Sequence, residues 1–274
     1  MFASLMSVIN HPENKNHKVK TILRIVWWKF NQLLFKLPTI VQLTKDIKCV
    51  CYPNSSYASL IIYNRLPEYA EMNYLLKVLG SKSNFVDVGS GLGDFSLLAA
   101  SKIQTGKIYA FEPTQSALSQ LHDNVNLNNL KDKIFIIPKI VSDKDGFEFF
   151  SDLPVTEENT ITSQSNHSKK IISTKLDSFF DNKINIDLLK IDVEGAELKA
   201  LHGAERMLEN KQIKKMLIEL NPKCQTFGYT RQDVLDCLLA HKYKLFTFDH
   251  QGKTLRFSKA QELTPLTVNI LATI

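Results

Sequence analysis

A glycine-rich turn between two apolar segments is the first feature of this sequence that could do chemistry. The stretch VDVGSGLGDFSLLAA carries Gly89, Gly91 and Gly93 between an apolar run and an apolar helical pattern. Glycines at such a turn let the backbone approach a ligand at a helix N-terminus. Asp94 stands where the dinucleotide fingerprint G-x-G-x-x-G needs a third small residue. The turn therefore predicts a small-molecule site and disfavours a dinucleotide.

Acidic residues close four of the apolar runs that we expect to form strands. Ligands of doubly wound sheets lie beyond the carboxyl ends of the strands, so these acids should lie near the ligand. Asp87, two residues before the glycine turn, would repel a pyrophosphate and attract a cationic amino-acid end. Together with Asp94 it favours S-adenosyl-L-methionine, which carries an ammonium and a sulfonium. The acids at strand ends are Asp87, Glu112, Asp192, Glu194 and Glu219.

Glu112 ends the second expected strand, where a carboxylate can accept both ribose hydroxyls of a nucleoside. NAD and S-adenosylmethionine both need that contact, so Glu112 predicts a nucleoside without choosing between them. The alternative is that Glu112 caps the helix expected over residues 114–128.

Several segments together resemble the FkbM family of class I S-adenosylmethionine-dependent methyltransferases. The segments are NFVDVGSGLGDFSLLA, IYAFEPTQSALSQLHDNVNLN, TKLDSFF, DLLKIDVEGAELKALHGAERML and KMLIELN. The FEP and KIDVEGAE elements at their separation make the resemblance specific, and it extends from about residue 57 to the C-terminus. It implies a seven-stranded Rossmann-like domain that methylates oxygen, often on sugars of glycans, antibiotics or other natural products.

The resemblance also implies roles for individual residues. Asp87 and Gly89 would line the methionine end of the cofactor, Glu112 its ribose, and Asp192 the wall beside the methyl group. Glu68 would fold over the cofactor, or else simply begin the solvated helix expected over 68–79. Family members commonly read D-x-G-A-N-x-G, whereas this chain has a serine and a glycine in place of the alanine and asparagine. The remaining expected cofactor contacts are Ser90, Gly91, Gly93, Pro113 and Ser142.

A hydroxyl acceptor must lose a proton during methyl transfer, which calls for a general base. Asp192, Glu194 and Glu219 are the candidates, because a partly buried carboxylate among carboxylates has a raised pKa. Asp192 and Glu194 have an alternative role as caps of the helix expected from Ala196.

The elements that must position these residues alternate between strand and helix patterns. This alternation predicts an α/β fold, a doubly wound sheet with helices on both faces. Together with the resemblance, it implies a seven-stranded, mostly parallel sheet with an N-terminal helical extension. The segment FEFFSD and residues 155–170 are interpreted as an inserted ribbon and loop, and His167 and His202 as surface residues. Helices are expected over 94–102, 116–128, 196–208 and 230–241, and strands over NFVDVG, KIYAFEP, IFIIPKIV, IDLLKIDVEG, KMLIELN, YKLFTFD and LTVNILATI.

Composition narrows the class of protein. The chain has 274 residues, 44% hydrophobic and 23% charged, which is enough for one large domain with an extension. Residues 1–50 hold eight basic and two acidic side chains, which accounts for the whole net charge of +6. The balanced remainder argues against nucleic-acid binding. The four cysteines form no C-x-x-C pair and no signal peptide opens the chain, so we expect a cytoplasmic protein without a metal.

The basic N-terminal arm contains an amphipathic pattern over Val19–Leu37, ended by Pro38 and too short and polar to span a membrane. We divide the chain into this arm, residues 1–56, and a methyltransferase domain, residues 57–274. The helix could pack on its own domain, pair with a second copy as a homodimer, or lie on a membrane. Asn31 and Gln32 favour a protein contact, because they would interrupt a lipid-facing surface.

Two rival functions belong to other classes. A nicotinamide-dependent oxidoreductase shares the strand, the glycine turn and the ribose acid, but Asp87 and Asp94 count against it. A non-catalytic cofactor-binding module would share the fold, and turnover is what separates it from an enzyme.

Overall fold

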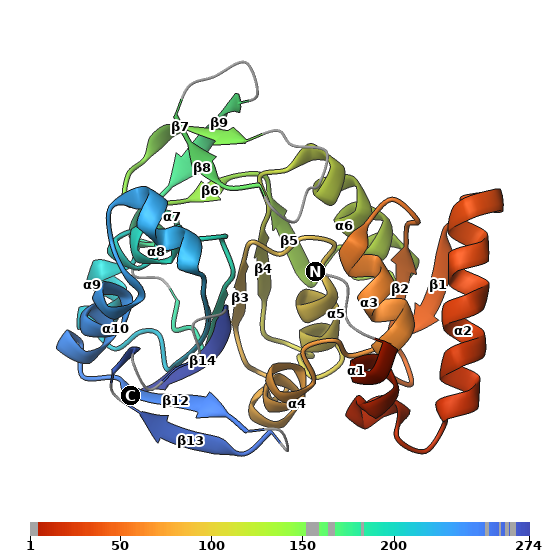
Figure 1. The fold of residues 1–274 in the computed structure, drawn as a ribbon. Helices are drawn as coiled ribbons and strands as arrows, with labels where there is room; N and C mark the ends of the chain where they lie inside the picture. Colours follow the sequence, from red (N-terminus) through yellow and green to blue (C-terminus); the bar gives the residue numbers. More distant parts are fainter. Residues whose placement is uncertain are drawn as a thin grey trace.

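The computed structural model describes residues 5–151, 159–163, 168–181, 184–249, 252–257, 259–260, 263 and 267–274. Its centre is an eight-stranded sheet in the order β13-β12-β14-β11-β10-β3-β4-β5 (Figure 1). The strands are β3 (Phe85–Val88), β4 (Ile108–Phe111), β5 (Ile134–Ile137), β10 (Leu188–Ile191), β11 (Lys215–Leu220), β12 (Lys244–Phe248), β13 (Thr254–Phe257) and β14 (Val268–Thr273).

The predicted doubly wound, mostly parallel sheet is confirmed. Strands β5, β4, β3, β10 and β11 pair in parallel, and β14 runs antiparallel to both β11 and β12. The expected count of seven strands is wrong, because β13 adds an eighth at the edge by pairing antiparallel with β12. Gly252, with φ +77°, lies in the tight turn that joins these two strands.

Helices cover both faces of the sheet, as predicted (Figure 1). Residues of α3 (Ser56–Asn64), α4 (Tyr69–Val78), α5 (Asp94–Ala100) and α6 (Gln115–Leu127) share one hydrophobic cluster. Residues of α7 (Leu176–Phe180), α8 (Glu197–His202), α9 (Glu205–Glu209) and α10 (Arg231–Ala240) share the cluster on the other face. Each strand therefore alternates its side chains between two apolar layers.

Two expected elements are divided. The helix expected over 196–208 ends at His202 and restarts at Glu205, because the backbone of Gly203 lies against the Ser142 carbonyl and the Asp177 carboxylate accepts the N–H groups of Arg206 and Met207. His202 itself is exposed, as expected. The run IFIIPKIV is divided around Pro138 into β5 and β6 (Ile140–Val141). Proline cannot donate to a strand ladder, so the chain leaves the sheet there.

β6 belongs to a second sheet in the order β6-β9-β7-β8, which confirms the inserted ribbon. Its other strands are β7 (Gly146–Ser151), β8 (Ile161–Thr162) and β9 (Ser168–Thr174). His167 and parts of the expected loop 155–170 lie outside the described residues.

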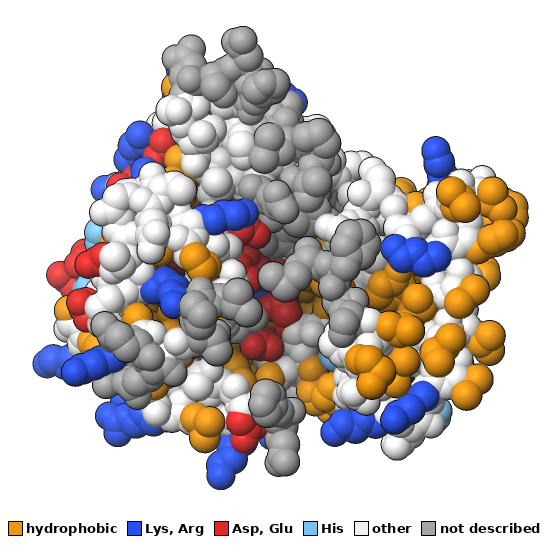
Figure 2. Space-filling view, viewed as in Figure 1, with side chains coloured by type: hydrophobic (Ala, Val, Ile, Leu, Met, Phe, Trp, Pro, Cys, Tyr) orange, Lys and Arg blue, Asp and Glu red, His pale blue; other side chains and the backbone are white. Residues whose placement is uncertain are grey.

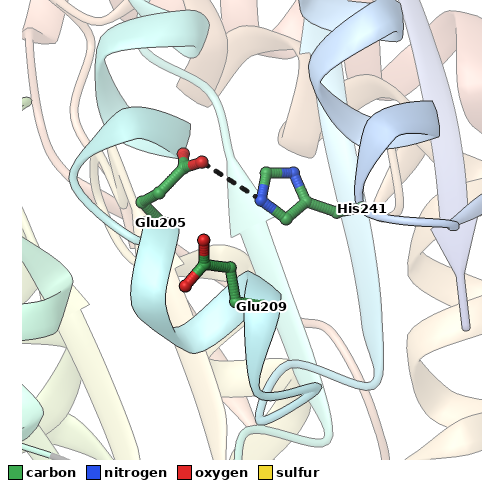
Figure 3. A group of neighbouring side chains, drawn as sticks. All are labelled: Glu205, Glu209 and His241. Atoms are coloured by element: carbon green, nitrogen blue, oxygen red, sulfur yellow. Dashed lines mark ion pairs between the residues drawn. The ribbon is translucent and has the colours of Figure 1, made fainter.

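An ion pair joins two helices on the face opposite α5. Nε2 of His241, the C-cap of α10, lies 3.2 Å from a carboxylate oxygen of Glu205 at the start of α9 (Figure 3). The other ring nitrogen, Nδ1, contacts the Cys237 carbonyl at 2.8 Å. Both ring nitrogens of His241 therefore contact neighbouring protein groups.

The N-terminal arm shares a core with the rest of the chain. It comprises α1 (Leu5–Asn10), the 3₁₀ turn Pro12–Asn14, α2 (Lys18–Phe30), the π-helical turn Asn31–Phe35 and the hairpin β1 (Thr39–Gln42) and β2 (Lys48–Cys51). The Asn124 side chain of α6 accepts the Val50 N–H at 2.6 Å. Because the same apolar cluster includes Trp28, Cys51 and Ala58, the core crosses the expected boundary at residue 56.

The predicted amphipathic helix is present, and it packs on its own domain through a narrow face. Trp28 is fully buried, and its indole N–H donates to the Ser59 hydroxyl of α3 at 3.0 Å. Asn31 is also buried, and Gln32 donates to the Pro53 carbonyl. The assumption that Asn31 and Gln32 interrupt an outward surface is therefore wrong. No helix in the described part of the chain is long and apolar enough to cross a membrane.

The adjacent tryptophans give a matched test of how strongly α2 supports the fold. We expect Trp28→Ala to lower the free energy of unfolding by about 3 to 5 kcal/mol, because it removes a fully buried ring. Trp27→Ala should cost under about 1 kcal/mol, because Trp27 is 50% exposed. Urea unfolding followed by far-ultraviolet circular dichroism measures both. Equal losses in the two variants would mean that α2 does not anchor through Trp28.

Candidate active site

The glycine turn lies at the carboxyl end of β3, against the end of β10. Gly89 has φ +79°, and a Cβ built on it would lie 1.8 Å from the Asp192 carbonyl oxygen. A side chain at this position would therefore separate the two strand ends. Gly91 also has a positive φ, and a Cβ there would meet nothing within 4 Å. The backbone at Gly91 is thus open to a ligand.

A cavity of about 220 Å³ begins at this turn. Figure 2 shows acidic side chains gathered in a hollow at the centre of the viewed face. All but two of the predicted site residues line the cavity: Glu68, Asp87, Gly89, Ser90, Gly91, Glu112, Pro113, Asp192, Glu194 and Glu219. The sequence therefore located most of the wall of one cavity.

The two remaining predictions, Gly93 and Ser142, fall outside the cavity lining. A Cβ on Gly93 would lie 2.3 Å from a methyl carbon of Leu121, so this glycine lets α5 and α6 approach each other. The Ser142 hydroxyl contacts Asp143 and Glu148, away from the cavity. Their assignment as cofactor contacts stays a prediction, and Ile140 and Val141 line the cavity just before Ser142.

A buried lysine lies among the acids on one face of the sheet. Lys190 of β10 is directly opposite Asp87 of β3 in the parallel register. Its ammonium lies 2.7 Å from the Asp192 carboxylate and 4.5 Å from the centroid of the Phe95 ring. Burial alone would lower the pKa of Lys190, but Asp192, Glu68 and Asp87 together raise that pKa well above its usual value. Lys190 is therefore a fixed cation.

The acids around Lys190 outnumber it. Burial raises the pKa of Asp87 to about 6, against the effect of Lys190. Burial and the nearby Glu68 raise the pKa of Asp94 to about 7. The Tyr57 hydroxyl joins these groups, contacting Glu68 at 2.8 Å and Asp94 at 2.9 Å. A cavity wall with this excess of carboxylates favours a positively charged ligand.

Two polar atoms in the cavity wall fit such a ligand. Asp87 accepts the Ser96 hydroxyl at 2.7 Å with one carboxylate oxygen, while the other oxygen is buried without a hydrogen-bond partner in the described structure. The buried Ser90 hydroxyl also lacks a hydrogen-bond partner there. Buried polar groups are normally paired, so these atoms suit a bound ligand that offers donors.

Glu112 holds the glycine turn as well as lining the cavity. One carboxylate oxygen accepts the Gly91 N–H at 2.9 Å, and the other accepts the Thr114 N–H at 2.7 Å, next to the first turn of α6. Each oxygen retains a second lone pair for a hydroxyl. The nucleoside role and the capping role of Glu112 are therefore compatible. Burial raises its pKa to about 7, although both backbone contacts lower it.

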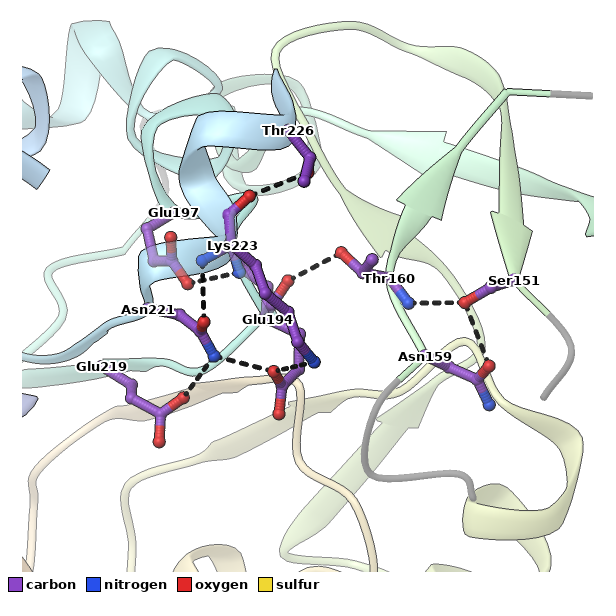
Figure 4. A network of polar contacts seen from close by, with 11 residues as sticks. Ser151, Asn159, Thr160, Glu194, Glu197, Glu219, Asn221, Lys223 and Thr226 are labelled. Atoms are coloured by element: carbon purple, nitrogen blue, oxygen red, sulfur yellow. Dashed lines mark hydrogen bonds and ion pairs between the residues drawn. The ribbon is translucent and has the colours of Figure 1, made fainter. Parts of the chain in front are cut away.

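Glu194 lies on the rim, in a network seen in Figure 4. One of its carboxylate oxygens accepts from the Asn221 amide at 2.7 Å and from the Lys223 ammonium at 2.9 Å. Burial raises the pKa of Glu194, while the hydrogen bond from Lys223 opposes that rise. The alternative that Asp192 or Glu194 caps α8 is wrong, because the N-cap Ala196 has no side-chain cap and Glu197 accepts the Gly195 N–H.

Glu219 completes the rim from β11. Burial, followed by the charge of Asp192, raises the pKa of Glu219 to about 10. One carboxylate oxygen from each of Asp192, Glu194 and Glu219 lies within 4.8 Å of the other two. The same holds for one ligand atom each of Glu205, Glu209 and His241, which is a ring nitrogen for the histidine. Lys190 and Lys223 already neutralise two of the rim acids. The expectation that the protein uses no metal stays a prediction.

Lys190 and Tyr57 line the cavity and were missed from the sequence. Lys190 carries a signal, because it is a charged residue inside the otherwise apolar strand run IDLLKID. Tyr57 precedes the first strand and has no such pattern, and the same holds for Glu71, which lies outside the cavity lining. Burial, then the charge of Glu68, raises the pKa of Glu71 to about 7.

Comparison with known proteins identifies the family. A sequence profile of the FkbM methyltransferase domain matches residues 87–245, more than half of the chain. The chain belongs to the FkbM methyltransferase family. It is 27% identical over 188 residues to methyltransferase sdnD of Sordaria araneosa. The match covers 56% of this chain and 72% of sdnD.

Solved structures show only distant similarity. An rRNA methylase from Streptococcus thermophilus has a TM-score of 0.45 and 15% identity, covering 76% of this chain and 96% of that one. TrmK of M. capricolum, in complex with S-adenosyl-homocysteine, has a TM-score of 0.40 and 15% identity. The match covers 74% of this chain and 67% of TrmK. At this distance neither structure contributes to the assignment.

The chain is therefore an S-adenosyl-L-methionine-dependent methyltransferase, which decides against the nicotinamide-dependent alternative. The residues present fit this cofactor: Asp87, Asp94 and Glu68 offer negative charge for its cationic methionine end, and Glu112 offers oxygens for its ribose. Gly89 and Gly91 provide backbone that a side chain does not cover.

Replacing Glu112 should weaken the binding of the cofactor product, S-adenosylhomocysteine. We expect Glu112→Ala to reduce affinity for S-adenosylhomocysteine by about 30-fold to several-hundred-fold, because roughly 2 to 4 kcal/mol of charged hydrogen bonds are lost. Glu148→Ala, at a buried acid outside the cavity lining, should leave the affinity unchanged. Isothermal calorimetry measures both and should detect no binding of NADH. Unchanged affinity in Glu112→Ala would place the nucleoside elsewhere.

The raised pKa values predict how stability and binding depend on pH. The pKa values of Asp87, Asp94 and Glu112 lie at about 6 to 7 in the folded protein, above their ordinary values. Their contribution to stability is therefore fully present at low pH and is lost as the pH rises through 7. We expect the melting temperature without ligand to fall as the pH rises from the ordinary pKa values of these acids, 3.8 to 4.5, through 7.

A cationic ligand should show the opposite trend, because it favours ionised carboxylates. Affinity for sinefungin, an analogue with a protonated amine at the sulfonium position, should rise with pH by up to about tenfold per pH unit for each proton released. S-adenosylhomocysteine, which lacks that charge, should show a weaker rise. Parallel pH profiles for the two ligands would contradict a carboxylate site for the sulfonium.

Proposed function

We propose that this methyltransferase transfers methyl to oxygen, on a hydroxyl of a saccharide, glycan or related natural product. The observation that supports this is Glu194, a rim carboxylate held in place from two sides beside the cofactor cavity. A hydroxyl is a poor nucleophile until its proton is removed, so O-methylation benefits from a base at this position.

Glu194 is the best base of the three rim acids. Asp192 is paired at 2.7 Å with the buried ammonium of Lys190, whereas Lys223, the lysine that contacts Glu194, has a side chain that is 42% exposed. The pKa of Glu219, at about 10, keeps that group protonated at neutral pH. Glu194 combines a pKa raised by burial with contacts to Lys223 and Asn221 that stabilise its ionised form. It can therefore be ionised near neutral pH and still accept a proton.

The cofactor, when bound, supplies an activated methyl group on a sulfonium. The chain then has to orient the acceptor, exclude water and remove one proton. Val193 and Phe150 provide apolar wall, and Asn159 brings an amide from beside β8. The Thr160 hydroxyl donates to the Val193 carbonyl, which fixes the second sheet over the Asp192–Glu194 loop (Figure 4).

An amide, a lysine and carboxylates at the rim suit a polyhydroxylated acceptor, since each can hydrogen-bond a hydroxyl.

All four cysteines carry free thiols, which supports a reducing, cytoplasmic compartment.

A neighbouring glutamate gives a control for the proposed base. We expect Glu194→Gln to lower turnover by roughly 10² to 10⁴ while cofactor affinity is retained. Glu197→Gln should preserve turnover, because Glu197 lies outside the cavity lining and its pKa of about 8, raised by burial, already keeps it largely neutral. Labelled S-adenosylmethionine with a glycan extract provides the assay. Full turnover of Glu194→Gln with an unchanged pH profile would overturn this role.

A further inference from the structure

The N-terminal helix presents most of its apolar side chains to solvent, while Trp28 faces the core. Eleven of the nineteen large apolar side chains that are exposed in the described structure lie between residues 19 and 40, each 40 to 75% exposed. We call them the N-terminal apolar face: Val19, Ile22, Leu23, Val26, Trp27, Phe30, Leu33, Leu34, Phe35, Leu37 and Ile40. Their helical spacing of three and four residues places most of them on one side of α2.

The opposite side of α2 carries the polar anchors. Thr21, Trp28 and Asn31 are buried. The Arg24 guanidinium donates to the Asn14 side chain at 2.8 Å, and Gln32 donates to Pro53. This is the reverse of a helix that lies on a soluble domain, where apolar residues face inward. Trp28 and Gln32 also reach the Ser59 hydroxyl of α3, so this side is fixed to the fold and the apolar face is left outside.

The charged residues within the segment that carries this face are all basic, and the acids Glu13 and Asp46 lie at its two ends. No aspartate or glutamate occurs between Asn14 and Lys45. Lys15, Lys18, Lys20, Lys29, Lys36 and Lys45 are all exposed. Figure 2 shows basic side chains at the border of the apolar patch over α2, with no acidic side chain beside them. Positive charge thus surrounds an apolar surface.

We propose that the N-terminal apolar face docks onto an anionic lipid surface. Apolar and aromatic side chains that enter the boundary between headgroups and acyl chains, with lysines at headgroup level, are the signature of an interfacial helix. A second copy is a poorer partner, because a two-fold interface would place this face against itself and bring like charges together. The helix is fixed in the fold before binding, so docking requires no folding of a disordered segment.

Docking also sets where the active site lies relative to the lipid. α2 contacts α3 through Trp28 and Ser59, and α3 carries Tyr57 in the cavity wall. The cavity is therefore separated from the docked helix by one helix.

Vesicle binding by the full chain tests the proposal. We expect co-sedimentation with vesicles of phosphatidylcholine containing 30% phosphatidylglycerol, at least about tenfold weaker binding to pure phosphatidylcholine, and a decrease in 0.5 M salt. The two tryptophans supply a local probe, because Trp27 is half exposed and Trp28 is fully buried. Binding should shift the emission to shorter wavelength, and Trp27→Phe should abolish most of that shift.

Two double variants with the same added charge distinguish lipid binding through this face from non-specific binding by other exposed apolar residues. Leu23→Glu/Leu34→Glu should lose vesicle binding, whereas Leu239→Glu/Leu255→Glu, at exposed apolar positions elsewhere, should retain it. Both double variants should keep the wild-type melting temperature and affinity for S-adenosylhomocysteine. If Leu23→Glu/Leu34→Glu unfolds, emission quenching of the wild-type chain by brominated lipid still tests the docking.

Two results would overturn the proposal. The first is absence of binding to the anionic vesicles by the full chain. The second is a dimer in light scattering that dissociates in Leu23→Glu/Leu34→Glu, which would show that a second copy covers the face.

Discussion

The buried ammonium of Lys190 is the interaction on which the site depends. It lies opposite Asp87 in the sheet, forms an ion pair with Asp192 and packs on the Phe95 ring of α5. Burying a charge is costly unless it is paired, so the fold must bring carboxylates to it from several elements. The parallel register of β3 and β10 brings Asp87, and the close approach of Gly89 to the Asp192 carbonyl sets the distance between the two strand ends.

The acids that satisfy Lys190 also define the ligand. One lysine does not balance Asp87, Asp94, Asp192 and Glu68. Burial is the main cause of the raised pKa values of Asp87 and Asp94, and the neighbouring carboxylates add to it. A protein can meet this cost by protonating the acids or by binding a cation. A site built this way selects a cationic cofactor over a pyrophosphate by charge, before any specific contact is made.

Much of this site could be predicted because strand ends are visible in sequence. Asp87, Glu112, Asp192, Glu194 and Glu219 each follow an apolar run, and parallel strands bring such positions to one edge. Tyr57 reaches the cavity from a helix that precedes the first strand, and no local pattern reports that contact. Ser142 and Gly93 fit the pattern, but packing against Glu148 and Leu121 uses them elsewhere. The break at Gly203 likewise depends on a tertiary contact with Ser142.

The N-terminal helix shows the same limit in another form. Periodicity located the helix, but it does not state which side faces the core. Hydrogen bonds decide this: Trp28 and Gln32 both reach the Ser59 hydroxyl of α3, and the Asn31 amide donates to the Leu37 carbonyl. Because these polar contacts need protein partners, they hold that side inward, and the apolar side is left outward. Asn31 and Gln32, expected from the sequence to interrupt the outward surface, thus help to hold the apolar side of α2 outward.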